Sequence, residues 1–467
     1  MPLRRTAVIN VVGLTESLLG PATPRLTAFR KKGRAALIRP ALPAVTCTAQ
    51  SNYLTGTPPS QHGAIANGWY DRELAEIQFW KQSNHLVQGR KVWEKLRERQ
   101  PGLTCAKLFW WYNMYSSADW SITPRPIYPA DGRKVFDIYT GPLSLRPEIK
   151  QALGDFPFPA FWGPAAGINT PQGRPEAASR WIADAAKWVE ERHQPGLSLI
   201  YLPHLDYNLQ RLGPAHPRIA QDLCAIDAIV GDVLDFFRAR DVAVLLLSEY
   251  GITPVDTPVH LNRVFRAQGW LTVKEELGLE LLDAGASRVF AVADHQIAHI
   301  YLNDPSLETQ VRDLVSRQPG VARVLAGPDK PQAGLDHRRS GDLIALSQEN
   351  AWFTYYYWDD DRWAPDFARC VDIHRKPGYD PVELFLDPSL AFLKFRIAWR
   401  LLRKRLGFRM LMDVIPLDAT LVKGSHGACP ANPRDYPILI SERPDLFSGE
   451  RLESTEVCQV IERAVLD

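Results

Sequence analysis

The side chains with the most chemistry to offer gather in one stretch, residues 43–71, PAVTCTAQSNYLTGTPPSQHGAIANGWYD. Hydroxyl, thiol, amide and imidazole groups lie there between apolar flanks. The turn residues 57–60 end a helical segment that begins near Thr48, so Thr46 stands close to a helix N-terminus. Two roles suit a hydroxyl at that position. It can act as a simple N-cap, or it can hold or attack a phosphate-type anion drawn to unpaired backbone N–H groups.

Acidic residues follow two buried strands elsewhere in the chain. Asp206 comes just after the apolar run 197–202, and Glu249 comes just after the run 242–247. In an open α/β sheet the carboxyl ends of the strands share one edge, where loops and helix N-termini form ligand sites. We therefore expect Asp206, Glu249 and Thr46 to converge.

Strands and helices alternate around these residues. Apolar runs at 7–14, 35–39 and 104–109 predict strands, and the periodic segments 91–98, 176–192 and 219–240 predict helices. From about residue 287 the pattern changes to several strands around one helix, which predicts a small α+β insertion.

Composition excludes several classes of protein. The chain has 467 residues and is 45% hydrophobic, enough for a large core, and its 55 Lys and Arg against 53 Asp and Glu give no reason to expect a nucleic-acid polymer as partner. Six cysteines without a C-x-x-C pair argue against a zinc knuckle or a disulfide framework and favour a reducing cytoplasm. No signal-peptide cleavage pattern follows the first residues, and no window approaches the roughly 18 apolar residues that span a bilayer.

Two segments carry further hypotheses. Residues 110–133 are rich in aromatic and turn residues and too irregular for a helix or strand, so they are either a pocket wall or a packed surface loop. The candidate substrate-binding residues there are Trp111, Tyr112, Asn113 and Tyr115. Residues 395–409 form a basic amphipathic helix, which is either a solvated face of the fold or a peripheral contact with an anionic membrane surface.

The order of motifs resembles the alkaline phosphatase superfamily, in particular its nucleotide pyrophosphatase/phosphodiesterase branch. The nucleophile Thr, a T-G dipeptide, P-x-x-H-G and an Asn-x-Trp pair of that branch correspond to Thr46, 55–56, 59–63 and 67–69. The separation between Thr46 and Asn67, 67 − 46 = 21 residues, matches the family spacing. The agreement continues through the two strand-end acids to KPGYDP at 376–381 and GSHG at 424–427.

This resemblance implies an alkaline-phosphatase-like three-layer α/β/α sandwich with an α+β insertion. We expect the core at residues 5–270 and 410–440, the insertion at 285–395 and a C-terminal extension at 441–467. The implied activity is hydrolysis of a phosphodiester, pyrophosphate or phosphonate bond in a small substrate. Thr46 would be the nucleophile, Asn67 the donor to the phosphoryl oxygen, and a divalent metal centre, usually zinc, would be held partly by Asp206, Glu249 and His426.

The metal ligands are where the sequence departs from the family pattern. Val12 replaces the first-strand Asp, Gln210 replaces a His, and Tyr250 replaces the His of S-D-H-G. The surviving donors suffice for one ion rather than two. Four residues could replace the missing ligands or merely form hydrogen bonds in the site wall: Asn10, His204, Gln210 and Tyr250. The histidines at 260, 295 and 374 are further candidates, but no motif position supports them.

Three functions therefore stay open. The first is a threonine-dependent hydrolase with a reduced or rebuilt metal site. The second is a catalytically inactive homologue that binds a phosphorylated ligand. The third is a metal-independent transferase or isomerase of a phosphorylated metabolite.

Overall fold

A nine-stranded sheet forms the centre of the computed structural model, which describes residues 3–131, 133–162 and 174–466. The strand order is β21-β2-β20-β9-β1-β8-β5-β6-β7, and the inner strands β9, β1, β8, β5 and β6 run parallel. The strands are β1 (Thr6–Val11), β2 (Arg34–Arg39), β5 (Cys105–Leu108), β6 (Trp120–Pro124), β7 (Ile138–Gly141), β8 (Leu197–Leu202), β9 (Ala243–Leu247), β20 (Ile438–Ser441) and β21 (Arg451–Glu453). Every residue of β1 and β8 is buried, as expected of strands covered on both faces.

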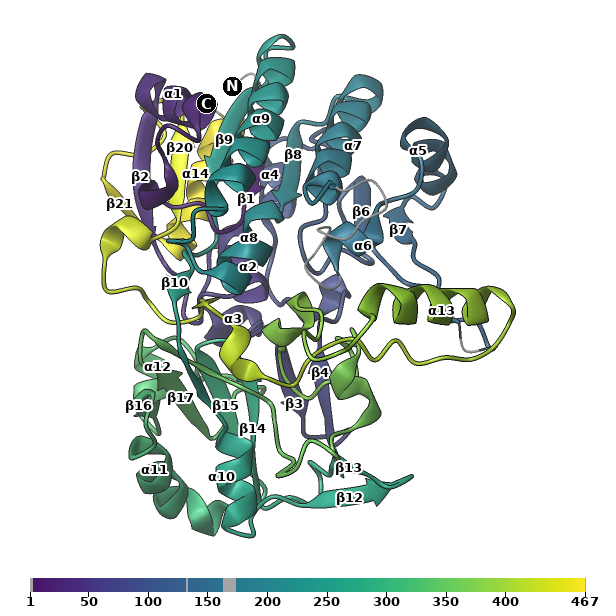
Figure 1. Cartoon of the computed structure of the whole chain (residues 1–467). Coiled ribbons are helices and arrows are strands. Elements are labelled where there is room, and N and C mark those ends of the chain that lie inside the picture. Colours follow the sequence, from purple (N-terminus) through teal and green to yellow (C-terminus); the bar gives the residue numbers. More distant parts are fainter. Residues whose placement is uncertain (1–2, 132, 163–173, 467) are drawn as a thin grey trace.

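Helices cover both faces of this sheet (Figure 1). On one side α1 (Pro24–Lys32), α7 (Ala177–His193) and α9 (Ile219–Arg238) contact one another, and α5 (Leu145–Leu153) packs on α7. On the other side α14 (Val457–Leu466) contacts α2 (Thr46–Thr55) and α4 (Val92–Arg99). This is the three-layer α/β/α sandwich that the sequence predicts.

The helix that carries Thr46 is fixed at both ends. α2 begins at Thr46 itself, and all ten of its residues are buried. It ends at Gly56, whose φ of 69° places it in the left-handed region that favours glycine. A Cβ there would lie 3.1 Å from the Cβ of Cys458, so α14 also limits this position to a small residue.

A second body of structure lies below the large sheet (Figure 1). Its four-stranded antiparallel sheet has the order β14-β15-β17-β16 and packs with α10 (Leu261–Ala267) and α11 (Glu308–Ser316) around its own hydrophobic core. The four strands are β14 (Val289–Asp294), β15 (Ile297–Leu302), β16 (Val321–Leu325) and β17 (Leu343–Ser347).

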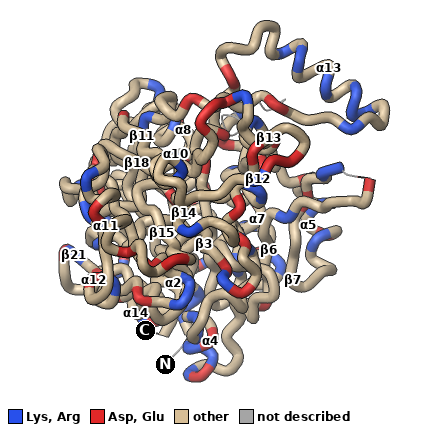
Figure 2. The backbone as a smooth tube through the Cα atoms, turned by 90° about the horizontal axis from the view of Figure 1, so that it is seen from below, with Lys and Arg blue, Asp and Glu red and all other residues tan. Residues whose placement is uncertain are grey.

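The remaining elements are short, apart from two helices. They are β3 (Gly68–Asp71), β4 (Glu76–Phe79), β10 (Thr253–Pro254), β11 (Thr257–Val259), β12 (Val273–Glu276), β13 (Leu279–Leu282), β18 (Ala351–Phe353), β19 (Gly424–Ser425), α3 (Pro59–His62), α6 (Phe158–Phe161), α8 (His204–Leu212), α12 (Asp329–Gln332) and α13 (Leu393–Arg405). Helix α13 projects from the body as an arm, and Figure 2 shows its basic residues along it. Of the helices within the described ranges, none is long and apolar enough to cross a membrane.

Two sequence expectations need comment. Residues 110–133 were expected to contain no regular element, but β6 lies within them and pairs with β5 and β7, so that expectation is wrong in part.

The predicted domain bounds stay a prediction. The 285–395 stretch does contain the second sheet, and β21 and α14 of the 441–467 stretch join the large sheet and one of its helical layers.

Candidate functional site

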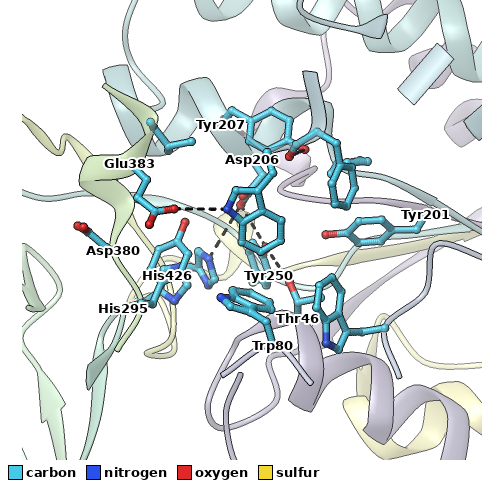
Figure 3. Close-up of a pocket in the computed structure, with 16 residues that line it drawn as sticks. Thr46, Trp80, Tyr201, Asp206, Tyr207, Tyr250, His295, Asp380, Glu383 and His426 are labelled. Atoms are coloured by element: carbon cyan, nitrogen blue, oxygen red, sulfur yellow. Dashed lines mark hydrogen bonds and ion pairs between the residues drawn. The ribbon is translucent and has the colours of Figure 1, made fainter. Parts of the chain in front are cut away.

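A cavity of about 70 Å³ lies between the large sheet and the second sheet (Figure 3). Thr46 enters it from the first turn of α2, Asp206 from α8 directly after β8, and Tyr250 from the loop after β9. His426 follows β19, and His295 lies in the turn between β14 and β15. The polar side chains that line the cavity therefore lie at the ends of strands from both sheets, as expected for the carboxyl edge of an α/β sheet.

A chain of hydrogen bonds runs through the cavity wall. The Thr46 hydroxyl lies 3.2 Å from the Tyr250 hydroxyl, and Tyr250 donates to Oδ1 of Asp206 at 3.1 Å. The Gln210 amide donates to the other oxygen, Oδ2, of Asp206 at 2.9 Å. The Tyr379 hydroxyl then donates to Oε1 of Gln210 at 3.1 Å. Both carboxylate oxygens of Asp206 are thus held by neutral donors.

Glu249 lies behind Thr46 and is fully buried. Its Oε1 accepts hydrogen bonds from the amides of Asn10 and Gln50, both at 2.5 Å. Burial raises the pKa of Glu249 to about 8, against the lowering effect of hydrogen bonds from Gln50, Asn10 and Thr46. Burial likewise raises the pKa of Asp206 to about 7. At neutral pH Glu249 is therefore mostly protonated, and Asp206 is close to the midpoint of its titration.

Two histidines stack with two tyrosines across the cavity. The ring centroids of Tyr250 and His426 lie 3.6 Å apart, those of His426 and His295 lie 3.7 Å apart, and those of His295 and Tyr379 lie 3.8 Å apart. Nδ1 of His426 lies 2.7 Å from the carbonyl oxygen of Ala44 and can only donate to it, which leaves Nε2 unprotonated at 3.9 Å from Oδ1 of Asp206. Burial holds the pKa of both histidines well below its usual range, so both rings are neutral.

Asn67 lies beside the site without entering the cavity. Its Oδ1 accepts the backbone N–H of Cys47 at 3.0 Å, near the start of α2. Its Nδ2 donates to Asp294 at 3.1 Å, and its backbone N–H donates to the same carboxylate at 2.7 Å. The amide therefore ties α2 to the end of β14. Its expected role as a donor to a phosphoryl oxygen stays a prediction.

Of the four residues expected to bind substrate in the 110–133 segment, one lines the cavity and three do not. Trp111 lines the cavity. Tyr112 is buried, and burial raises its pKa well above the usual range. The Asn113 amide donates to the carbonyl oxygens of Lys107 and Ile122. Tyr115 is exposed, and none of these last three expected residues is among those that line the cavity.

Three expected auxiliary residues, Asn10, His204 and Gln210, are not among those that line the cavity, although Gln210 bonds to two that do, Asp206 and Tyr379. Asn10 reaches the site only through Glu249. His204 is buried, with Nε2 3.3 Å from Asp222 of α9. Sequence reasoning missed several wall residues, namely Trp80, Phe161, Trp162, Tyr201, Pro203, Tyr207, Asp380, Glu383 and Leu384. Among these residues, Asp380 lies in the KPGYDP motif, which also contains the wall residue Tyr379, so this motif was a sequence signal for that part of the wall.

The donor set does not fit the metal centre that the resemblance implies. Val12 is a buried apolar side chain, and Tyr250 and Gln210 bond to Asp206 where the family pattern has histidine ligands. Throughout the described part of the chain, no group of three or more His, Cys, Asp or Glu side chains is arranged to hold a metal ion. The expected zinc stays a prediction that this site's chemistry does not favour.

The cavity wall also contains few positive charges. Its acidic residues are Asp206, Asp380 and Glu383, and no Lys or Arg is among the residues that line it. Lys376 is buried behind the wall, with Nζ 2.7 Å from both Asp380 and Glu383. A ligand in the cavity would therefore meet aromatic rings, hydroxyl groups, the N-terminus of α2 and three carboxyl groups, two of them paired with Lys376, rather than a cationic clamp.

Known proteins share this architecture. The phosphonoacetate hydrolase of Sinorhizobium meliloti 1021, solved with phosphonoformate, superimposes with a TM-score of 0.60 at 14% sequence identity, covering 99% of this chain and 96% of that one. Murine ectonucleotide pyrophosphatase/phosphodiesterase 5 gives a TM-score of 0.56 at 13% identity, covering 97% and 93% of the two chains. An inactive form of that murine protein, in complex with AMP, gives 0.57 at 13% identity, covering 98% and 95%.

At these identities the structural likeness shows the fold, which is that of the alkaline phosphatases. No curated protein matches the sequence. The family model for type I phosphodiesterase / nucleotide pyrophosphatase matches residues 6–380, which is most of the chain. The chain therefore belongs to the type I phosphodiesterase/nucleotide pyrophosphatase family of the alkaline phosphatase superfamily.

Proposed function

We propose that this protein binds a small phosphorylated or phosphonate ligand at Thr46 and does not hydrolyse it with a metal pair. The observation that carries the proposal is the hydrogen-bond chain around Asp206, whose two oxygens are taken by Tyr250 and Gln210. A carboxylate that serves a metal ion needs a free oxygen and neighbouring imidazoles or thiolates. Here a phenol and an amide stand in their place.

The position of Thr46 supports an anionic ligand. Thr46 is the first residue of α2 and lines the cavity, so the positive end of the helix dipole lies at the space that a ligand would take, while the N–H of Cys47 is already bonded to Asn67. Burial raises the pKa of Asp206 to about 7, and a protonated Asp206 would not repel an anion. The cavity of about 70 Å³ would take a group of phosphonate size, and it shares Trp80, Trp111 and Trp162 with the larger groove beside it.

The second candidate is a hydrolase that uses Thr46 as its nucleophile, and the environment of Glu249 favours it. Glu249 lies behind Thr46 with no partner on its Oε2, and burial raises its pKa to about 8, so the ionised fraction could accept a proton. In that reaction Thr46 Oγ1 attacks phosphorus, its proton passes to Glu249, and the bond to the leaving oxygen breaks. No arginine or lysine lines the described cavity to stabilise the charge on phosphorus, and so we rank this candidate second.

The discriminating experiment combines binding with turnover. Titration calorimetry with phosphonoformate is expected to show binding by the wild type and at least about tenfold weaker binding by Thr46→Val, since a charge-assisted hydrogen bond is lost. Thr420→Val, an exposed threonine outside the cavity, is the matched control. The purified protein is expected to contain no stoichiometric metal and to leave bis(p-nitrophenyl) phosphate intact.

Other results would overturn the proposal in distinct ways. Hydrolysis without added metal, lost in both Thr46→Val and Glu249→Gln, would establish the second candidate. Chelator-sensitive hydrolysis with about one metal ion per chain would restore the metal-dependent reaction. Equal affinity of the wild type and Thr46→Val for phosphonoformate would remove Thr46 from the binding site.

A further inference from the structure

The arm formed by α13 exposes apolar side chains that the fold leaves uncovered. The helix contains no buried residue. Phe395, Trp399, Leu402 and Leu406 follow one another at spacings of four, three and four residues, so they share one face of the helix. Their exposures are 72%, 52%, 47% and 65%. Isolated apolar residues on a protein surface are common, but a continuous stripe of large ones marks an interaction face.

The opposite face of the helix attaches the arm to the protein. Leu393 and Ile397 pack against the second hydrophobic core. Arg396 and Arg400 form ion pairs with Asp413 on the returning chain. The helix is therefore held in place while the stripe points away from these contacts.

Positive charge flanks the stripe. Residues 393–412 contain seven Lys and Arg residues and no acidic residue, in a chain whose net charge is only +2. Apart from the two arginines held by Asp413, no cation of this stretch forms an ion pair with another residue in the described part of the chain. The charge is available to a partner, and Figure 2 shows it lying along the projecting arm.

The protein itself cannot supply that partner. A groove of about 1450 Å³ separates the arm from the body, and its far wall includes Arg125, Arg133 and Lys134. Lys404 and Arg405 line the arm's side of the groove. The acids in its described lining, Asp131 and Asp366, already form ion pairs with Arg133 and Arg375 of the same lining. A second copy docked through the same face would bring the cations of two arms together, because a two-fold contact pairs a surface with itself.

We infer that α13 is an interfacial helix that docks this protein on an anionic lipid bilayer. The stripe of Phe395, Trp399, Leu402 and Leu406 inserts at the boundary between headgroups and acyl chains, and the flanking cations contact the lipid phosphates. Both requirements for such binding, an apolar face and a basic rim, lie on this one element. The inference is independent of what the cavity binds.

Vesicle sedimentation with the full chain tests this inference. Binding is expected to vesicles of phosphatidylcholine with 30% phosphatidylglycerol, and at least about tenfold weaker binding to pure phosphatidylcholine. About 0.5 M NaCl should weaken binding to the anionic vesicles, because salt screens the basic rim. Trp399→Glu should weaken binding about tenfold or more. Trp363→Glu, which replaces a tryptophan of similar exposure elsewhere on the surface, should bind like the wild type.

The basic rim is tested in the same assay by Lys394→Glu with Arg403→Glu, two exposed cations that flank the stripe, and the control is Lys31→Glu with Lys32→Glu at the end of α1. Only the first pair should lower binding. Because α13 has no buried residue, circular dichroism is expected to show each variant folded. Equal binding by the Trp399 and Trp363 variants would overturn the inference. So would a dimer in light scattering that Trp399→Glu dissociates while vesicles bind no protein.

Discussion

Replacing Glu249 by Gln gives the most direct measure of the electrostatics behind Thr46. Burial raises the pKa of Glu249 from 4.5 to about 8, so the folded protein keeps this proton over a pH range in which the unfolded chain has lost it. The native state binds more protons between those values, and its stability therefore falls as the pH rises. The stability contribution is present in full below about pH 4.5 and is lost as the pH passes through about 8.

The size of the effect follows from that shift. At 1.36 kcal/mol per pKa unit, ionisation of Glu249 costs the wild type about 1 kcal/mol at pH 5.5 and about 4–5 kcal/mol at pH 8.5. Glu249→Gln does not titrate. Its amide oxygen can still accept from Asn10 and Gln50, and its NH₂ group takes the place of Oε2, which has no partner in the structure. Relative to the wild type, the variant should thus gain about 3 kcal/mol between the two pH values.

Urea unfolding at pH 5.5, 7.0 and 8.5, in the presence of EDTA, measures this difference. Asp206→Asn is the companion variant, because burial raises the pKa of Asp206 to about 7 and its gain should be complete at lower pH. Parallel stability profiles for the wild type and Glu249→Gln would refute the reasoning. A wild type that zinc stabilises at high pH, while Glu249→Gln does not respond to it, would show instead that Glu249 serves a metal.

Three further predictions concern the same region. Gln210→His together with Tyr250→His should raise the zinc content after dialysis from below about 0.1 to about one ion per chain, because two imidazoles would then join Asp206. An unchanged metal content would mean that other groups block the site. Affinity for phosphonoformate should fall about tenfold per pH unit above pH 7, where anion binding must take up a proton at Asp206; affinity that rises with pH would indicate a cationic ligand. Lys376→Met should lower the unfolding free energy by about 3–5 kcal/mol in urea, since it leaves two buried carboxylates unpaired, and a loss below about 1 kcal/mol would show that they are protonated.

The sequence predicts the large sheet well because its signals are local. Continuous apolar runs predicted β8 and β9 to within one residue and placed the end of β1 three residues too late, and the 3.6-residue period predicted α7 and α9. β6 was missed because Trp120–Pro124 sits in an aromatic, turn-rich stretch and ends in proline, so no alternation marks it. Its strand character comes from pairing with β5 and β7, which no local pattern records.

The part of the candidate site that the large sheet and its loops form was predictable from the sequence, and the part that the second sheet contributes was not. Thr46, Asp206, Tyr250 and His426 were identified from strand ends and motif spacing, and the structure places all four around one cavity. His295 was named only as a reserve without positional support, because it reaches the cavity from the second sheet.

The direction of the Asn67 amide was unpredictable for the same reason. The sequence spacing brings Asn67 to the start of α2, but it is a carboxylate at the end of β14, Asp294, that turns the amide away from the cavity. Sequence spacing fixes which residues meet. It does not fix which way a side chain faces once a second sheet competes for its hydrogen bonds.

The stacked rings explain why the departures from the family pattern occur together. Tyr250, His426, His295 and Tyr379 form a continuous row of rings from the large sheet to the second sheet, and the close contact of the two imidazoles disfavours a charge on both at once. Tyr250 stacks on His426 at one end of this row of rings, and Gln210 accepts a hydrogen bond from the Tyr379 hydroxyl at the other end. The two residues that replace the family's histidines therefore lie at opposite ends of the row. A change at either position alone would leave a buried polar group of Asp206 or Tyr379 without its partner. The two replacements are therefore parts of one hydrogen-bonded link between the two sheets.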